Sequence, residues 1–297
     1  MLKGIAELMD AEVNHRNRAS RTLLVGLVLL LAFAAGCSGL FQNLGAKWVT
    51  RQIAAEFNLD EAQTAATRAS VERLMAAAPA ALNSKVDMLV ATVDAGIAKG
   101  FTNESLLRIE KQVDKLADVV AGAIIDEASP ILATLTDEQI DFAEERINER
   151  LQEARDQLAE PADERLEERQ DRFVEQVEEW ADELTPAQEA SLRSYIAGLP
   201  DESAVRLRAD EMRLGRISAL VRSHRGPEAI RDGLWTEWKE RENFGRDARS
   251  PAERRAEGRK TILYVHDLLT PEQRDYASKH LHELHDQLKS FLGAAGS

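Results

Sequence analysis

Apolar residues recur at spacings of three and four along most of the chain, which is the period of an amphipathic α-helix. The clearest run begins at Ile140, Ala143 and Ile147, and the stretch from Leu166 to Leu184 continues the same face. No stretch of the sequence alternates apolar and polar residues over the length of a strand. The pattern predicts an all-α chain of roughly ten amphipathic helices, forming either an elongated bundle or two packed helical subdomains.

Eight prolines divide this pattern. Because proline lacks an amide hydrogen, it is tolerated in the first turn of a helix and in connections, and we expect these prolines at such places. Pro161 lies in the run from 140 to 184 without a change of phase, so one kinked helix and a helical hairpin both fit. The prolines are Pro79, Pro130, Pro161, Pro186, Pro200, Pro227, Pro251 and Pro271.

The most apolar stretch lies near the start of the chain. It runs from residue 22 to 35, follows three arginines, and ends at Gly36 and Cys37, the single cysteine. A membrane span needs about 20 apolar residues, whereas this stretch has about 14, which is typical of a secretory signal peptide. The small residues before Cys37 resemble a bacterial lipobox, although Ala34 stands where Leu is more usual. We expect residues 1–36 to be a signal peptide and Cys37 to carry fatty acids such as palmitate; the alternative is a buried core cysteine.

This resemblance implies a location. A lipidated Cys37 followed by Ser38 predicts a lipoprotein of the bacterial outer membrane that faces the periplasm, bound to the membrane through several acyl chains. Met9 is an alternative start. The formal net charge of −14 disfavours nucleic acid as a partner.

Charge also divides the body of the chain. Residues 137–183 are strongly acidic, whereas residues 206–260 contain more Lys and Arg than Asp and Glu. We therefore expect an N-terminal helical region over 37–199 and a C-terminal helical region over 200–297. The basic residues indicate a solvated helix surface or, less commonly, an anion-binding face, since no nucleic-acid-binding motif accompanies them. They are Arg206, Arg208, Arg213, Arg216, Arg222 and Arg225.

One motif, L-[T/D]-x-x-Q, occurs four times. Thr or Asp at the start of a helix accepts a hydrogen bond from a first-turn amide, and Gln three residues later binds the amide of the capping residue. Each motif therefore predicts a helix start worth about 1 kcal/mol. Only Leu135 has an apolar partner, Ile140, for a hydrophobic staple. The motifs are Leu59, Asp60 and Gln63; Leu135, Thr136 and Gln139; Leu184, Thr185 and Gln188; and Leu269, Thr270 and Gln273.

The repeated motif resembles the hallmark of the CpxP and Spy group of small periplasmic helical proteins. That resemblance implies ATP-independent chaperoning or stress sensing. The wider layout is similar to larger proteobacterial lipoproteins of unknown function, with an early aromatic helix, an acidic helix leading into Trp180 and Leu184, and a last helix starting at L-T-P-E-Q. Repeated structural caps without functional meaning are the alternative explanation.

Catalytic patterns are absent from the sequence: it has no Gly-rich phosphate loop, nucleophile elbow or H-E-x-x-H helix. His282, His285 and Asp286 would share one side of a helix and are weak candidates for a metal site. They are equally compatible with the solvated flank of a helix whose buried side carries Leu284 and Leu288. We expect no enzyme, no cofactor and no bound metal.

Two kinds of function fit. The first is a lipid-anchored binding protein of the cell envelope, chaperone-like or stress-related, that holds protein clients. The second is a structural or assembly lipoprotein that docks one dedicated envelope partner. A large exposed apolar surface would favour the first, and one compact apolar spot would favour the second. Metal-responsive sensing through the late histidines is a third possibility.

Overall fold

The computed structural model describes residues 41–223 and 226–295, which form ten α-helices and no strand, so the all-α prediction is confirmed. The predicted signal peptide, Cys37 and Arg225 lie outside these residues. Within the described part, no helix is both long and apolar enough to span a membrane. The helices are α3 (Phe41–Phe57), α4 (Glu61–Lys99), α5 (Asn103–Leu132), α6 (Asp137–Ala159), α7 (Ala162–Ala181), α8 (Pro186–Ala197), α9 (Ser203–Arg222), α10 (Pro227–Lys239), α11 (Pro251–Leu268) and α12 (Pro271–Ala295).

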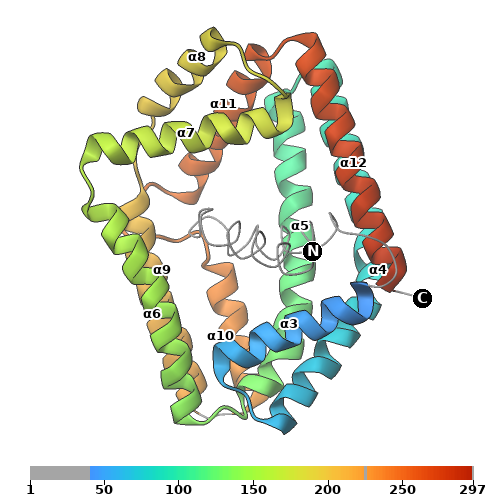
Figure 1. Cartoon of the computed structure of the whole chain (residues 1–297), viewed down its shortest axis with the longest axis vertical. Helices are drawn as coiled ribbons and strands as arrows, with labels where there is room; N and C mark the ends of the chain where they lie inside the picture. The colour runs from blue at the N-terminus through green and yellow to red at the C-terminus, as the bar shows by residue number, and fades with distance from the viewer. Residues whose placement is uncertain (1–40, 224–225, 296–297) are drawn as a thin grey trace, which may run out of the picture.

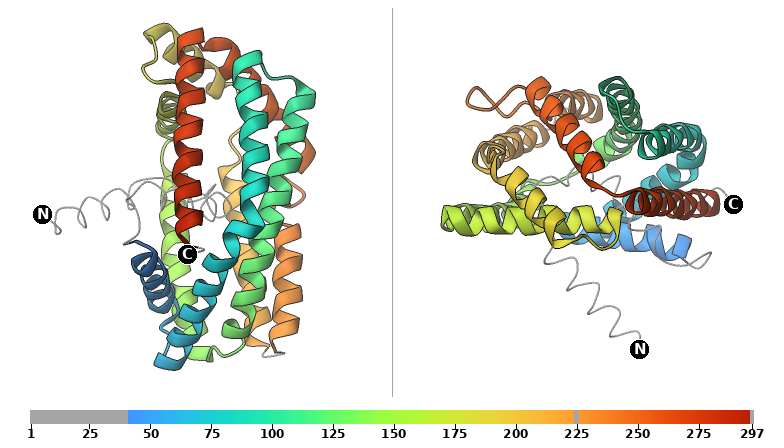
Figure 2. Two further views of the ribbon diagram at one scale, coloured as in Figure 1. Left: turned by 90° about the vertical axis from the view of Figure 1, so that its right-hand side faces the viewer. Right: turned by 90° about the horizontal axis from the view of Figure 1, so that it is seen from above.

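The helices form a four-sided frame (Figure 1). The long helices α4, α5 and α12 make one side, α6 and α9 make the opposite side, α7 crosses one end and α3 crosses the other. The circuit is closed because α3 contacts both α4 and α6, and α12 contacts both α4 and α7. Helices of the region 200–297 pack on those of the region 37–199, since α9 contacts α6, α10 contacts α5 and α12 contacts α4. Figure 2 shows the same frame from the side and from above.

Buried apolar residues form three separate clusters in the described chain. One joins α7, α8 and the end of α11, a second joins α4, α5 and α12, and a third lies where α5, α6 and α9 meet. Each cluster is small, so no single core ties all sides of the frame together. The buried members are Val174, Val177, Ala181, Leu184, Leu192 and Leu269; Leu82, Val86, Leu116, Leu288 and Leu292; and Leu135, Ile140 and Val221.

Two prolines lie where they were not expected. Pro79 is in the interior of α4 and Pro130 is near the end of α5. An interior proline costs about 3 kcal/mol, but α4 is a 39-residue helix that packs on α3, α5 and α12, and this packing outweighs the local cost. Pro186, Pro227 and Pro251, by contrast, stand in the first turns of their helices as predicted.

The break at Pro161 separates two helices. α6 ends at Ala159 and α7 begins at Ala162, and the chain turns a corner of the frame between them (Figure 1). Arg165 Nη1 donates to the carbonyls of Leu158 at 3.1 Å and Glu160 at 2.7 Å, and so satisfies acceptors that the end of α6 leaves free.

The predicted apolar face of α7 is wrong at one position. Trp180 belongs to the apolar face predicted from Leu166 to Leu184, but it is 38 % exposed, and Ala181 is completely buried in its place. At its end α7 packs closely on α8, and the small side chain of Ala181 fits that contact. The Trp180 ring packs instead edge-on against His280 of α12, with centroids 5.1 Å apart.

Candidate functional site

Each of the four L-[T/D]-x-x-Q motifs starts a helix in the structure. At the start of α4, for example, Gln63 N donates to Asp60 Oδ1 at 2.8 Å, and Asp60 N donates to Gln63 Oε1 at 3.0 Å. The same reciprocal bonds occur at the starts of α6, α8 and α12. The motif residues therefore act locally as capping boxes.

The motifs also meet in pairs. Gln63 Nε2 donates to Thr134 O at 3.0 Å, and Gln139 Nε2 donates to Asn58 O at 2.8 Å. The two side-chain amides also bond to each other, with 3.0 Å between Gln63 Nε2 and Gln139 Oε1 and 2.7 Å in the reverse direction. We call this pairing of residues 58–63 with 134–139 the first clasp.

Gln188 and Gln273 repeat this arrangement at the other end of the frame. Gln188 Nε2 donates to Leu268 O and Gln273 Nε2 donates to Glu183 O, each at 2.9 Å. Gln188 Nε2 lies 2.7 Å from Gln273 Oε1. We call the pairing of residues 183–188 with 268–273 the second clasp. Each glutamine oxygen thus caps its own helix, while its amide hydrogens bind the partner segment, so the buried amide is satisfied on both sides.

The leucines of the motifs bury each clasp in its own apolar cluster. Leu135 lies with Ile140, its predicted staple partner, and Leu59 packs against them. Leu184 and Leu269 lie together in the cluster at the second clasp. The sequence predicts the caps, because all the residues of a cap lie within four consecutive positions. The pairing was missed because it joins residues 76 and 85 positions apart.

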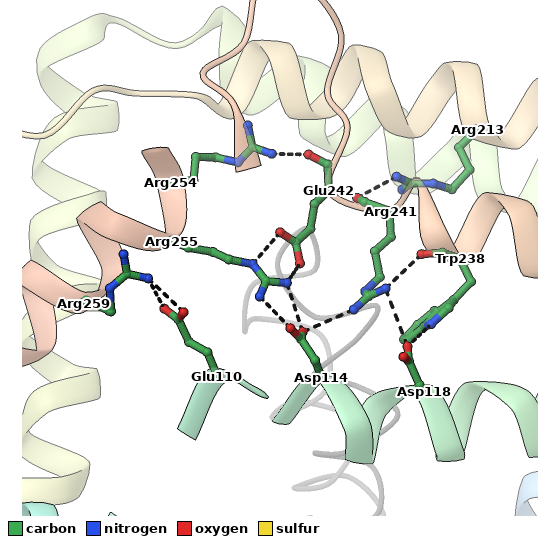
Figure 3. Close-up of polar contacts among 10 residues, drawn as sticks. All are labelled: Glu110, Asp114, Asp118, Arg213, Trp238, Arg241, Glu242, Arg254, Arg255 and Arg259. Atoms are coloured by element: carbon green, nitrogen blue, oxygen red, sulfur yellow. Dashed lines mark hydrogen bonds and ion pairs between the residues drawn. The ribbon is translucent and has the colours of Figure 1, made fainter. Parts of the chain in front are cut away.

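A second polar constellation joins α5 to α10 and α11 (Figure 3). Glu110, Asp114 and Asp118 are four residues apart on α5 and so lie on one face. Arg255 binds Asp114 with 2.6 Å between Nη1 and Oδ2, and Arg259 Nη1 binds Glu110 at 2.8 Å. Because Glu242 and Asp114 both hydrogen-bond its guanidinium, the pKa of Arg255 is raised. The same face also receives Arg241, 3.5 Å from Asp114, and Trp238 Nε1, 2.8 Å from Asp118.

The basic residues for which an anion-binding face was the less favoured interpretation are largely paired within the chain. Arg216 binds Glu237 at 2.6 Å. Arg222 binds Glu144 at 3.0 Å and also contacts Asp141. Arg213 binds Asp210 at 2.8 Å, Arg206 lies over the Phe244 ring, and Arg208 is exposed. These contacts favour a structural role for the basic segment over an open anion site.

The late histidines bind α12 to α4 and do not gather. His285 Nε2 lies 2.7 Å from Asp87 Oδ1, and His282 Nε2 lies 3.4 Å from Asp94 Oδ1. Asp286 points to solvent, with 84 % of its side chain exposed. Among the described residues, no group of three His, Cys, Asp or Glu side chains is placed to hold a metal ion. Lys289 and His285 lower the pKa of Asp87 by hydrogen bonding, so these contacts stabilise the packing of α12 on α4.

Shallow surface hollows occur on two faces of the described chain. One lies between α8 and α11 beside the stacked rings of Tyr195 and Tyr264, whose centroids are 4.1 Å apart. The other lies along α6 and is lined mainly by carboxylates. Ser191, in the first hollow, donates its hydroxyl to the carbonyl of Ala187 at 2.8 Å, so it acts there as a helix-surface hydroxyl.

An apolar stripe runs along α5. Val113, Ala117, Val120 and Ile124 follow a four, three, four spacing and therefore share one side of the helix. Val113 is 40 % exposed and Ile124 is 46 % exposed, which is high for branched apolar side chains in the middle of a helix.

The other three sides of α5 are assigned by their contacts. Leu116 packs into the cluster shared with α4 and α12, and Val120 of the stripe also packs against that cluster. Asp114 belongs to the side facing α10 and α11. A third side carries the exposed charges Lys115 and Asp126. α4 and α10 flank α5 (Figure 2), and the charged side of α5 lies opposite the stripe. From this arrangement and the helix period we infer that the stripe faces the inside of the frame.

Comparison with known proteins gives a family but no activity. No curated protein and no solved structure shows a significant match to the chain. Residues 81–235 match the model of a family of unknown function, DUF6279, and this segment is just over half of the chain. It begins within α4 and ends within α10, so it contains the apolar stripe of α5 and the first part of the basic segment, residues 206–235. The chain therefore belongs to the DUF6279 family.

Proposed function

We propose that this chain is a non-catalytic, lipid-anchored binding protein of the cell envelope that holds extended or partly unfolded polypeptides in a chaperone-like manner. The apolar stripe of α5, residues 113, 117, 120 and 124, is the observation that carries the proposal. It is partly exposed and lies on the inner side of a frame whose other helices are rich in charge.

The physical chemistry of such a surface suits weak and general binding. Burying apolar side chains against a client yields roughly 25 cal/mol per Å² and does not depend on client sequence. The acidic helices α6 and α7 would attract basic segments over longer distances and keep the loaded protein soluble. The three small cores allow one side of the frame to adjust without unfolding another.

The location rests on the leader sequence and on the resemblance to CpxP and Spy. We propose that acylated Cys37 holds the frame at the periplasmic face of the outer membrane. Fractionation of cells that express a Cys37→Ser form tests this. The account expects release of that form into the soluble envelope fraction, and continued membrane retention would contradict it.

Suppression of aggregation tests client binding. We expect the purified wild-type chain to slow the aggregation of a chemically unfolded model protein, and Val113→Glu and Ile124→Glu to reduce this effect severalfold, because each places a charge in the stripe. Ala123→Glu is the matched control, since it adds the same charge at an exposed position on the same helix. Equal suppression by all four proteins would exclude the stripe as the client site.

A compact aromatic spot supports the alternative function of docking one dedicated envelope partner. Trp180 and Tyr276 are 38 % and 39 % exposed, and both pack on His280 where α7 meets α12. Exposed aromatic residues often anchor specific protein interfaces. If this alternative holds, Trp180→Ala will abolish crosslinking to a single envelope protein, and the wild-type chain will leave aggregation unchanged.

A further inference from the structure

The segment from residue 240 to 260, which we call the arginine clamp, is attached in an unusual way. It comprises the loop between α10 and α11 and the first half of α11. None of the residues of α11 is buried. The second half of α11 packs on the cluster of the second clasp through Tyr264, Val265 and Leu268, whereas the first half reaches the rest of the frame through arginine side chains.

The clamp is joined to α5 mainly by ion pairs (Figure 3), whereas α9 also contributes Arg213, which donates to the carbonyl of Arg241 at 2.9 Å. Arg255 and Arg241 bind Asp114, and Arg259 binds Glu110. The base of the loop is fixed to the start of α9, where Arg249 Nε lies 3.0 Å from Glu202 Oε1.

Several contacts stiffen the clamp internally. Arg255 also binds Glu242, and Arg254 donates to the carbonyl of Glu242. The guanidinium of Arg254 lies over the Phe244 ring, 4.1 Å from its centroid. The clamp is therefore tied together by its own contacts and is joined to α5 through charge.

Partly exposed ion pairs respond to salt differently from apolar clusters. The Debye length falls from about 10 Å at 0.1 M salt to about 3 Å at 1 M, so added salt weakens charged contacts that solvent reaches. The Asp114 and Arg255 side chains are each about one third exposed. Apolar contacts such as those of the two clasps do not weaken in this way.

We propose that the arginine clamp is a salt-sensitive latch that releases from α5 as a unit when ionic strength rises, while both clasps stay closed. Release frees the side of α5 that carries Glu110 and Asp114, next to the apolar stripe. Release of the latch does not depend on the proposed function. The further step, in which release widens access to the stripe, rests on the proposed function.

Hydrogen exchange on the full chain tests the latch. Exchange of the backbone amides is measured by mass spectrometry at about 0.05 M and about 1 M NaCl. We expect amides of the clamp to exchange at least about tenfold faster at high salt, and amides of α4, α6 and α8 to change by less than about twofold. The proposal would be overturned if the exchange rates of the clamp amides did not depend on salt, or if salt accelerated amide exchange equally in all helices.

Matched variants separate the latch from general stability. Asp114→Asn keeps the shape of the side chain but removes the charge, and we expect rapid clamp exchange already at low salt. Asp126→Asn removes the same charge from the outer side of α5 and should leave the clamp slow. If the two variants behave alike, Asp114 does not hold the clamp.

A charge exchange provides the rescue. Glu110→Arg places two positive groups together and should release the clamp, and the double variant Glu110→Arg with Arg259→Glu should restore slow exchange. Failure of this rescue, with α4 and α6 still protected, would count against the latch. Because no client is present, these measurements can fail while client binding holds, and they can succeed while client binding fails.

Discussion

Four buried glutamines explain why this motif contains Gln rather than Glu. In an isolated capping box the two residues are interchangeable, because only the side-chain oxygen is used. In the clasps the amide nitrogen is used as well, and it donates to the partner segment. The cap of α11 supplies the contrast: Ser250 and Glu253 form an exposed capping box that has no partner motif, and there the acid is present.

The first prediction compares these two settings. Gln188→Glu keeps the cap of α8 but removes the donor to Leu268 O and places a carboxylate beside Gln273 Oε1. We expect a loss of about 2–3 kcal/mol in the free energy of unfolding, because a buried polar group loses its partner. Urea unfolding measures this loss, and Glu253→Gln in the exposed cap should change stability by less than about 0.5 kcal/mol. Similar losses in both variants would mean that the clasp adds nothing to the cap.

The second prediction concerns pH. The pKa of Asp87 is lowered by hydrogen bonds from Lys289 and then His285. The unfolded chain therefore takes up a proton at Asp87 at a higher pH than the folded chain does. The stability that ionised Asp87 contributes is complete above about pH 4, and it is lost as the pH falls through the lower pKa of the folded chain.

Urea unfolding at about pH 6 and about pH 3 measures the effect. We expect Asp87→Asn to lose less stability on acidification than the wild type, because Asn has no proton to gain. Ser84→Asn, an exposed substitution on the same helix, should follow the wild type. An unchanged dependence on pH in Asp87→Asn would exclude Asp87 as a source of the acid sensitivity.

At the scale of helices, the sequence predicts starts better than lengths. The starts of α4, α6, α8 and α12 follow from capping motifs that are local. The lengths of α4 and α5 do not, because Pro79 and Pro130 would each end a helix if local preference decided. Packing among α4, α5 and α12 decides instead, and no short segment of sequence contains that information.

The third prediction tests how closely the end of α4 is packed. A Cβ added at Gly96 would lie 2.1 Å from Cε1 of Phe101, whose ring packs against His266 of α11. Gly96→Ala should therefore destabilise the chain by about 1–3 kcal/mol despite the better helix propensity of alanine.

Gly215→Ala is the matched control. Nothing lies within 4 Å of a Cβ at Gly215 in α9, so alanine there should stabilise the chain by about 0.5–1 kcal/mol. Thermal unfolding of both variants shows whether each substitution raises or lowers the stability of the chain. Stabilisation by Gly96→Ala would show that Phe101 moves away at little cost.

At the scale of the whole molecule, fold class and charge distribution could be predicted but the frame could not. The three-and-four spacing predicts helices wherever it occurs, and the basic segment stands out in composition. The frame depends on contacts between distant segments, such as Arg255 with Asp114 and Gln188 with Gln273, and each of those residues taken alone is an ordinary helix residue. The apolar stripe of α5 was hidden for a similar reason, because only the placement of α4 and α10 shows that Val113 and Ile124 stay exposed.

The most direct test of a client-holding frame is photo-crosslinking in intact cell envelopes, with a photoreactive amino acid at single positions of α5. The account predicts crosslinks to several envelope proteins from the stripe positions Val113 and Ile124, and few from Lys115 and Asp126 on the outer side of the same helix. Equal crosslinking from both sides, or one crosslinked protein that is captured only from Trp180, would contradict the account.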